Sequence, residues 1–331
     1  MGIDCDDRRL NSQYNYPIIK LPNYQIRPLL KWVGGKRQLL PELRRFYPSS
    51  FNRYIEPFFG SGAVFFDLHA AGLLGGKEVV LIDSNADLIG CYRTVRDAPE
   101  AVARELTRLA ARRTHDPRGH YFHVRDERFN PLRETLRSSD GAVAYTPALA
   151  AMFIYLNRTG FNGLFRVNAR GTFNVPPGRY ERPRIVDRGK LKQVAAALGA
   201  PGVTIEHDGF ERAQAIASPA DFIYFDPPYA PLTRTSNFTS YTAARFDRGD
   251  QVRLQQMAIE LAARGCHVVI SNSSADEILE LYERDAAARR AGLQVYRVRA
   301  RRAINSKASR RGAVDELVIT NVQSPALQTS C

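Results

Sequence analysis

Short apolar runs alternate with helix-forming stretches along most of the chain. Five runs have the length and composition of buried strands, and two later runs, at 294–299 and 316–320, are typical of a terminal β-hairpin. The five runs lie at 53–57, 79–82, 203–205, 222–225 and 267–270. Helix-forming segments lie at 63–68, 101–113, 148–156, 189–198 and 251–264. This alternation predicts an α/β fold with a mostly parallel sheet that binds ligands at the carboxyl ends of its strands.

One long stretch interrupts the alternation. Residues 87–186 are mainly helical and end in a segment rich in Gly and Asn, so we expect them to form a unit inserted into the sheet domain. The sheet domain then consists of residues 27–86 and 187–322, with an irregular extension at 1–26 and a polar tail at 323–331. A chain of 331 residues with 44% hydrophobic residues can bury a substantial core.

The sequence Asp226-Pro227-Pro228-Tyr229 directly follows the apolar run at 222–225. The exocyclic amine of a nucleobase is a poor nucleophile because its lone pair is delocalised into the ring. Two acceptors for its N–H groups would free that lone pair: the carboxylate of Asp226 and the carbonyl of Pro227, which a proline turn holds in place. The ring of Tyr229 could stack on the base. The alternative is a strand that merely ends in a proline turn.

A glycine turn, Gly60-Ser61-Gly62, joins a predicted strand to a predicted helix. Glycines let a ligand approach the backbone closely, and a helix N-terminus offers unpaired N–H groups. The next strand ends at Asp83, about 20 residues later, where an acidic side chain can bind the hydroxyls of a ribose. Phe65 replaces the third glycine of the dinucleotide fingerprint, which favours a nucleoside cofactor without phosphates, such as S-adenosylmethionine. The alternative is a helix-capping turn near an exposed aspartate.

A third cluster, at residues 30–36, places the only Trp of the chain, Trp32, between Lys31 and Lys36 and beside a Gly pair. A flat aromatic ring can stack on a purine, and an ammonium group can pair with the carboxylate of a methionine moiety. The cluster is not a phosphate-binding P-loop, because Arg37 follows Lys36 where Ser or Thr is required. The alternative is a core Trp32 flanked by solvated lysines.

The net charge agrees with a DNA partner. The chain has 47 Lys and Arg against 34 Asp and Glu, a formal net charge of +13 and a pI of about 9.8. Such an excess suits a surface that neutralises the phosphates of double-stranded DNA. A basic soluble protein without this partner would have the same composition.

Other sequence features narrow the class of protein. No apolar run approaches the ~18 residues of a membrane-spanning helix, and the N-terminus lacks a signal-peptide pattern, so we expect a cytoplasmic protein. The four cysteines are scattered without a C-x-x-C pair, which indicates free thiols. His120 and His123 have no accompanying Cys or second His pair, so we expect no metal site.

In the order in which they occur, these motifs resemble those of the Dam family of DNA adenine-N6 methyltransferases. The matching blocks are KWVGGK at 31–36, EPFFGSG at 56–62 and DPPY at 226–229. The central segment is similar to the target-recognition region of Dam enzymes that read GATC. Its matching blocks lie at 155–158, 161–166, 173–176 and 178–180. The resemblance extends from about residue 30 to about residue 322, and several motifs in fixed order are more specific than any one of them.

The resemblance implies a Rossmann-like S-adenosylmethionine-dependent methyltransferase sheet of seven strands, with an antiparallel strand in the last hairpin and an inserted, mainly helical target-recognition domain. It implies methyl transfer, without a metal, to N6 of an adenine flipped out of double-stranded DNA. The implied catalytic residues are Asp226, Pro227 and Tyr229. The implied cofactor-binding residues are Trp32, Lys36, Phe59, Gly60, Ser61, Gly62, Asp83, Phe210 and Asp226.

The resemblance also implies roles in reading DNA. Arg166 would bind guanine through two hydrogen bonds, Leu164 would touch the thymine methyl group, and Lys31 would approach the outer guanine. Phosphate contacts would come from Arg125, Asn168, Asn174 and Arg179. The same surface would include Phe161, Asn162, Pro176 and Tyr180, with Asn237, Phe238 and Tyr241 from a loop near the flipped base. Thr159 and Pro177 replace the aromatic residues of many GATC-reading relatives, which leaves the flanking-base preference open.

Three alternatives stay open at this point. A cytosine-N4 methyltransferase would use the same fold, although relatives of that kind usually have Ser in place of Asp226. A DNA-binding protein that has lost catalysis is disfavoured by the intact Asp226 and Tyr229. A nicotinamide-dependent dehydrogenase is disfavoured by the missing glycine. We expect a monomer in solution.

Overall fold

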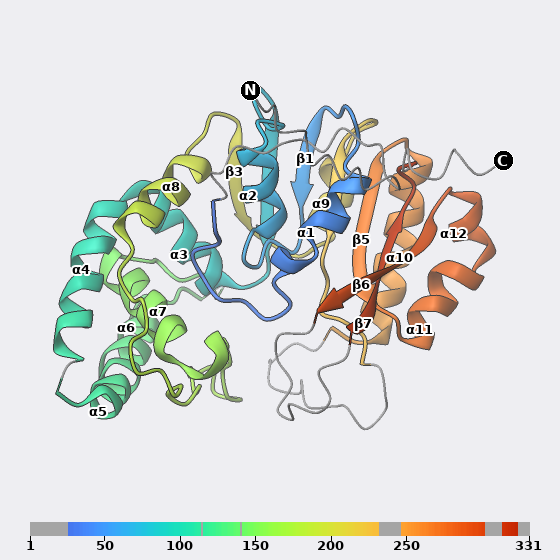
Figure 1. Cartoon of the computed structure of the whole chain (residues 1–331). Helices are drawn as coiled ribbons and strands as arrows, with labels where there is room; N and C mark the ends of the chain where they lie inside the picture. Colours follow the sequence, from blue (N-terminus) through green and yellow to red (C-terminus); the bar gives the residue numbers. More distant parts are fainter. Residues whose placement is uncertain (1–25, 114, 140, 232–245, 302–312, 324–331) are drawn as a thin grey trace, which may run out of the picture.

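The computed structural model describes residues 26–113, 115–139, 141–231, 246–301 and 313–323. A seven-stranded sheet with the order β3-β2-β1-β4-β5-β7-β6 runs through its centre (Figure 1). Neighbouring strands are parallel except around β7, which is antiparallel to both β5 and β6. The predicted α/β sheet with a terminal hairpin is therefore confirmed. The strands are β1 (Arg53–Glu56), β2 (Glu78–Asp83), β3 (Val203–His207), β4 (Phe222–Phe225), β5 (His267–Ser273), β6 (Gln294–Arg301) and β7 (Ala313–Thr320).

Helices lie beside the sheet and in the segment between β2 and β3 (Figure 1). Among the residues that the structure describes, no helix is long and apolar enough to cross a membrane. The α-helices are α1 (Leu40–Leu43), α2 (Ala63–Ala70), α3 (Ala86–Asp97), α4 (Pro99–Arg112), α5 (Pro117–Phe122), α6 (Asn130–Thr135), α7 (Pro147–Thr159), α8 (Arg188–Leu198), α9 (Arg212–Ile216), α10 (Arg248–Ala263), α11 (Asp276–Leu279) and α12 (Ala286–Arg290). Short 3-10 helices are η1 (Lys36–Gln38), η2 (Arg44–Phe46) and η4 (Phe161–Gly163), and π-helical turns are η3 (His123–Phe129) and η5 (Glu280–Arg284).

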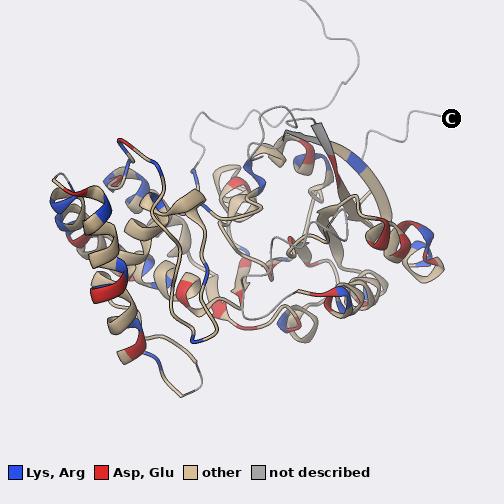
Figure 2. Ribbon diagram, turned by 90° about the horizontal axis from the view of Figure 1, so that it is seen from below, with Lys and Arg blue, Asp and Glu red and all other residues tan. Residues whose placement is uncertain are grey.

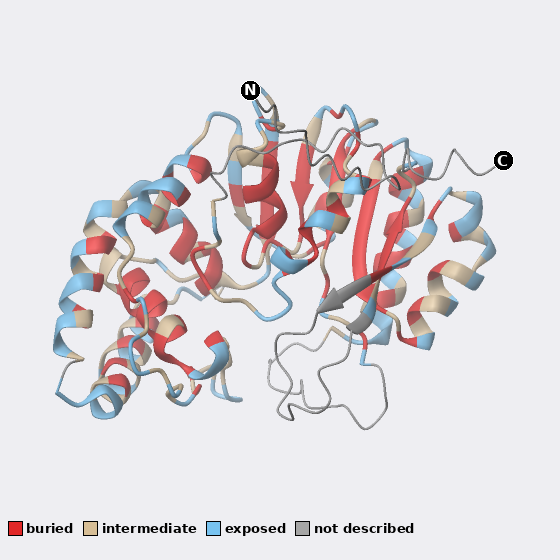
Figure 3. Ribbon diagram, in the orientation of Figure 1, coloured by how far each residue is buried: buried red, intermediate tan, exposed pale blue. Residues whose placement is uncertain are grey.

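The alternation of side chains along the strands divides the core into two apolar clusters. Successive residues of a strand point to opposite faces of the sheet. Tyr54 and Phe222 belong to the cluster that includes the buried residues of α2, α4 and α7. Ile55 and Ile223 belong to the other cluster, which includes the buried residues of α10. Figure 3 shows the buried residues concentrated on the central strands and on α2, with exposed residues along the outer side of α4.

The segment between β2 and β3 carries helices α3 to α8, at the left of Figure 1. Helix α4 packs against α7, and α3 packs against both α8 and β3. Leu106 of α4 and Phe153 of α7 belong to the same apolar cluster as Tyr54 of the sheet. The helices thus share their core with one face of the sheet. That residues 87–186 form a separate inserted domain stays a prediction.

Candidate functional site

Three of the sequence motifs meet at one edge of the sheet. Strands β2, β1 and β4 are neighbours in that order, and all three are parallel. Asp83 ends β2, the turn with Gly60 follows β1, and Asp226 follows β4, so all three lie at carboxyl ends. Strand β1 points downward in Figure 1, and Figure 2 views the molecule from that side. Figure 2 also shows Lys and Arg on the loops of the helical segment at its left.

Asp226 and Lys36 form an ion pair at this edge. Lys36 Nζ lies 2.7 Å from Asp226 Oδ1, and the two side chains are 6% and 19% exposed. The same ammonium group lies 4.3 Å from the centre of the Tyr229 ring, so it forms a cation–π contact. The structure therefore brings together three residues that come from two distant motifs.

The turn after β4 is held by hydrogen bonds from the strands and helix behind it. Tyr229 Oη donates to Glu316 Oε2 on β7 at 2.7 Å. Gln251 Nε2 donates to the carbonyl of Pro228 at 3.1 Å, and Asn272 Nδ2 donates to Gln251 Oε1 at 3.1 Å. These contacts restrict where the Tyr229 ring can lie. The sequence motifs did not indicate the supporting roles of Glu316, Gln251 and Asn272.

The carboxyl group of Asp226 is electrostatically unusual. Burial raises its pKa to about 6, although Lys36 acts in the opposite direction and Glu316 adds to the rise. A buried carboxylate loses hydration, and the nearby cation restores part of that loss. Perturbed carboxyl groups of this kind occur often in active sites.

The glycine turn is tied to Asp83. The N–H of Gly60 donates to Asp83 Oδ2 and the N–H of Asn85 donates to Asp83 Oδ1, each at 2.9 Å. Burial raises the pKa of Asp83, and these two N–H groups oppose the rise. Ser61 is buried within the turn, and Phe59 is buried in the core beneath it. The turn and the aspartate therefore form one unit, as their spacing in the sequence suggested.

Glu56 supports the glycine turn from the end of β1. Its Oε2 accepts from Tyr54 Oη at 2.9 Å and from the N–H of Phe65 at 3.2 Å. Burial raises the pKa of this carboxyl group well above its usual value, and the charges of Asp226 and Asp83 add to the rise. Glu56 belongs to the EPFFGSG motif, but its spacing gave no sign of this supporting role.

Two aromatic contacts flank the edge. Trp32 stacks against Phe165, with ring centres 6.2 Å apart, and a side chain at Gly60 would come within 3.0 Å of the Trp32 ring. Phe210 stacks on Phe58 at 5.4 Å. The role of Phe210 beside the adenine of a cofactor stays a prediction.

The Gly- and Asn-rich segment forms a hairpin over residues 165–174. Val167 pairs with Phe173 in an antiparallel bridge. Arg166 Nε donates to Asn174 Oδ1 at 2.7 Å, so these two candidate DNA-binding side chains are joined. Asn168 Oδ1 accepts from the N–H groups of Arg170 and Thr172, which holds the turn at the tip of the hairpin.

Other candidate DNA-binding residues surround this hairpin. Lys31 Nζ lies 4.1 Å from the centre of the Tyr180 ring, and the N–H of Phe161 donates to the carbonyl of Pro176. The Phe161 side chain is 47% exposed, which is unusual for a large apolar residue. Leu164 packs against the core. Asn162 has a left-handed backbone, Arg179 is exposed, and Arg125 binds the carbonyl of Val175 and the carboxylate of Asp126.

The three loop residues that were expected near the flipped base, Asn237, Phe238 and Tyr241, lie outside the described residues. Cys91 and Cys266 are free and buried, and burial raises the pKa of both thiols. Over the described ranges, no three His, Cys, Asp or Glu side chains are grouped so that they could hold a metal ion.

Related sequences identify the family. Residues 32–304 match the model of the D12 class N6 adenine-specific DNA methyltransferases. The chain belongs to this family. This D12 class methyltransferase is thus an enzyme that methylates adenine in DNA. The family assignment therefore replaces the three alternatives: a cytosine-N4 methyltransferase, a nicotinamide-dependent dehydrogenase and a DNA-binding protein without catalysis. A methyltransferase of this family implies S-adenosylmethionine as the methyl donor.

Similarity to individual methyltransferases spans nearly the whole chain. The chain is 37% identical over 300 residues to Type II methyltransferase M1.LlaDCHI of Lactococcus lactis subsp. cremoris, which covers 89% of this chain and 95% of that protein. It is 37% identical over 308 residues to Type II methyltransferase M.MjaIII of Methanocaldococcus jannaschii, covering 90% and 99%. It is 34% identical over 303 residues to DNA adenine methylase of Escherichia coli K12, covering 91% and 98%.

Proposed function

We propose that S-adenosylmethionine binds at the carboxyl edge of β1 and β2, and that the enzyme methylates the adenine of GATC in double-stranded DNA. Two glycine loops face each other at this edge, since a side chain at Gly35 would come within 3.6 Å of Ser61 Oγ. Such loops let a ligand lie close to the backbone. The two oxygens of Asp83 each keep a lone pair for a ribose hydroxyl after accepting one N–H group. The residues present therefore fit a nucleoside cofactor.

The residues around Asp226 suit an amine that receives a methyl group. When bound, S-adenosylmethionine supplies that group on a sulfonium centre. Asp226 and the carbonyl of Pro227 would accept the N–H groups of the adenine amine, and Tyr229 would stack on its ring. The observation that carries this proposal is the position of Lys36, whose ammonium lies 2.7 Å from the carboxylate and 4.3 Å from the ring centre. One hydrogen-bond donor thus contacts both the carboxylate and the ring, as the amine of a bound adenine would.

The hairpin at 165–174 suits a segment that recognises base edges in the major groove of DNA. Arg166 would bind guanine through two hydrogen bonds, with its Nε steadied by Asn174, and Leu164 would contact the thymine methyl group. Lys31, beside Tyr180, would approach the outer guanine. Phosphate contacts from Arg125, Asn168, Asn174 and Arg179, with Phe161, Asn162, Pro176 and Tyr180 along the same surface, would fix the register on DNA. Extrusion of the adenine costs a few kcal/mol, which these contacts would offset.

The decisive test combines base identification with two variants. The purified enzyme is incubated with labelled S-adenosylmethionine and duplexes that contain GATC or a scrambled site, and the labelled base is identified. We expect N6-methyladenine in the GATC duplex alone. Asp226→Ala should abolish transfer while DNA affinity stays close to that of the wild type, and Arg166→Ala should relax discrimination at one base pair by about 1–3 kcal/mol.

Each part of the proposal fails on a different result. Equal labelling of the two duplexes would contradict the GATC assignment. Normal transfer by Asp226→Ala would contradict its catalytic role. The control is Asp276→Ala, which removes an exposed carboxylate on α11 and should behave as the wild type.

A further inference from the structure

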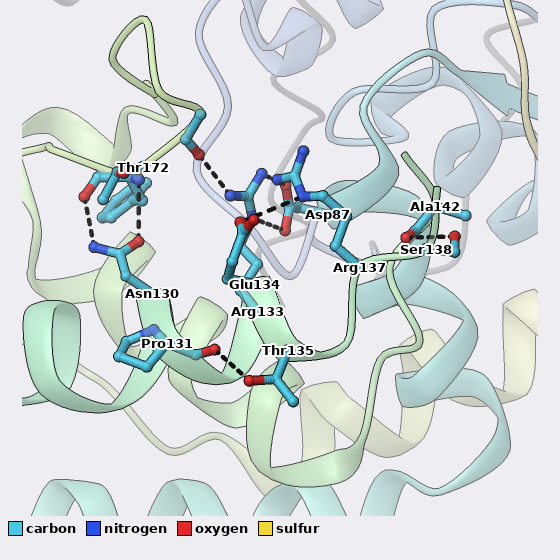
Figure 4. Close-up of polar contacts among 12 residues, drawn as sticks. Asp87, Asn130, Pro131, Arg133, Glu134, Thr135, Arg137, Ser138, Ala142 and Thr172 are labelled. Atoms are coloured by element: carbon cyan, nitrogen blue, oxygen red, sulfur yellow. Dashed lines mark hydrogen bonds and ion pairs between the residues drawn. The ribbon is translucent and has the colours of Figure 1, made fainter. Parts of the chain in front are cut away.

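A buried guanidinium connects the hairpin at 165–174 with helix α3 (Figure 4). Arg133, on α6, donates from Nε and Nη2 to the two oxygens of Asp87, at 2.6 and 2.7 Å. Its Nη1 donates to the carbonyl of Gly171, at the tip of the hairpin, at 2.6 Å. The side chains of Arg133 and Asp87 are only 7% and 4% exposed. The planar guanidinium suits this arrangement, because its fork can bind a carboxylate through two bonds and still donate elsewhere.

A second side chain of α6 holds the same hairpin. Asn130 Nδ2 donates to the carbonyl of Phe173, and Asn130 Oδ1 accepts from the N–H of Phe173, each at 3.0 Å. Figure 4 shows Asn130 and Arg133 reaching from the same helix toward the turn around Thr172. One amide side chain thus replaces a partner strand for the backbone of Phe173.

An isolated two-stranded hairpin is only marginally stable in water. The hairpin at 165–174 has one antiparallel bridge, between Val167 and Phe173, and its outer residues Asn168 and Arg170 are exposed. Contacts outside it therefore add to its rigidity. The Phe173 ring packs against Phe129 in the core, and Arg133 and Asn130 provide the polar contacts to the backbone of the strand that returns from the tip.

We propose that Arg133 and Asn130 are positioning residues that set the accuracy of sequence reading. The inference rests on the proposed function, in which Arg166 of this hairpin binds guanine. A contact through two hydrogen bonds requires its groups to be held close to the productive geometry, which surrounding residues must enforce. When the hairpin is released from α6, Arg166 samples other positions, and the correct and incorrect base pairs become harder to distinguish.

The anchor of this network lies near the candidate cofactor site. Asp87 is in the first turn of α3, which Asn85 caps by accepting from the N–H of Leu88. The N–H of Asn85 in turn donates to Asp83. Tyr145 Oη also donates to Asp87, at 3.0 Å. The reading hairpin is therefore fixed to the helix that begins beside the residue proposed to bind the ribose.

The test compares variants that release the hairpin with variants that leave it held. Asn130→Ala removes both bonds to Phe173 without leaving a buried charge. The double variant Asp87→Leu with Arg133→Met removes the donor to Gly171 and the buried ion pair together, because a single substitution would leave one charge buried and unpaired. Thr135→Ala is the matched control, since Thr135 is exposed on the same helix and its hydroxyl donates to the carbonyl of Pro131 within that helix. Arg166→Ala is the reference variant, because it lacks the side chain that is proposed to bind guanine.

The readout is a ratio of two kcat/KM values. The first is measured on a duplex with the unmodified site that the wild-type enzyme methylates, and the second on duplexes in which one base pair of that site is replaced. We expect this ratio to fall by about tenfold at the pair read by Arg166, in both releasing variants. The affinity for S-adenosylmethionine should stay close to the wild-type value, which shows that the releasing variants are folded, and Thr135→Ala should keep the wild-type ratio. Wild-type discrimination in both releasing variants, with discrimination lost in Arg166→Ala, would overturn the inference alone. Wild-type discrimination in Arg166→Ala would instead refute the proposed reading role, and the inference with it.

Discussion

The carboxyl group of Asp226 gives the enzyme a predictable dependence on pH. Burial raises its pKa to about 6, and its proposed role requires the ionised form, which accepts hydrogen bonds. We therefore expect kcat/KM to fall by about tenfold per unit as pH decreases below about 6, measured by initial rates at a series of pH values. The free energy of unfolding depends on pH in the opposite direction. The pKa of Asp226 in the folded state exceeds the ordinary value of 3.8, so the contribution of this carboxyl group to stability is complete below pH 3.8 and is lost as pH rises through about 6.

A variant of Lys36 tests which group causes this fall in kcat/KM at low pH. Lys36 lowers the pKa of Asp226, so Lys36→Met should move the fall in kcat/KM to a higher pH. Lys192→Met is the control, because Lys192 is 67% exposed on α8 and binds Glu100 instead. If kcat/KM of Lys36→Met falls at the same pH as that of the wild type, a group other than Asp226 controls the pH dependence.

Local sequence identified some site residues and could not identify others. Asp226 and Tyr229 belong to one contiguous motif, so their pattern was visible in the chain. Glu316 is 87 positions from Tyr229, and it reaches the ring only because β7 pairs with β5 in the register that opposes Ser273 to Glu316. Such a register depends on the tertiary arrangement of strands, which no short motif encodes.

At the scale of elements, the turn before α2 depends on a glycine for two separate reasons. Gly62 has a φ of +68°, and a side chain there would come within 2.5 Å of the Phe59 ring. Gly76 has a similar φ of +70°, but nothing lies within 4 Å of a side chain placed there. Both Gly→Ala variants should lose about 1–2 kcal/mol through backbone strain. Gly62→Ala should lose a further ~1–3 kcal/mol through overpacking.

Urea unfolding of the two variants measures this difference directly. Gly76→Ala serves as the control for backbone strain, because its surroundings are open. Gly62→Ala should also weaken the binding of S-adenosylmethionine, since the displaced turn carries Gly60 and its bond to Asp83. Equal stability of the two variants would contradict the role of Phe59 in limiting this position.

The apolar pattern of the sequence predicted long regular elements better than short irregular ones. Strands such as β4 and helices such as α10 follow clear apolar patterns, and the structure contains both. The run from α5 through η3 to α6 was predicted only as part of a broad helical span. It contains Gly119 and Pro131, which disfavour helix, and a π-helical turn that disturbs the 3.6-residue period.

At the scale of the whole molecule, the shared core predicts cooperative unfolding. One apolar cluster extends from Tyr54 in the sheet to Phe153 in α7, and Trp32 packs against it beside Phe165. Unfolding by urea should therefore show one transition, with the fluorescence of Trp32 and far-ultraviolet circular dichroism changing together. Two separate transitions would indicate that the segment between β2 and β3 unfolds independently of the sheet.

The resemblance implied seven strands with an antiparallel strand in the last hairpin, but the apolar runs did not predict the order of the strands. Periodicity located the strands, but it contains no information on which strands are neighbours. Right-handed crossovers and parallel pairing limit the choices without selecting one. The position of β7 between β5 and β6 is therefore a property of the folded chain that the residue pattern alone left open.

The late position of Glu316 in the chain has a consequence for biosynthesis. A ribosome completes the hairpin at 165–174 and the motif with Asp226 before it adds β7. Until β7 emerges and inserts between β5 and β6, the hydroxyl of Tyr229 lacks its acceptor. A polypeptide that stops before β7 would thus contain the hairpin proposed to bind DNA but would lack the acceptor that anchors the Tyr229 ring, so the proposed stacking on the base requires β7 to be folded into the sheet.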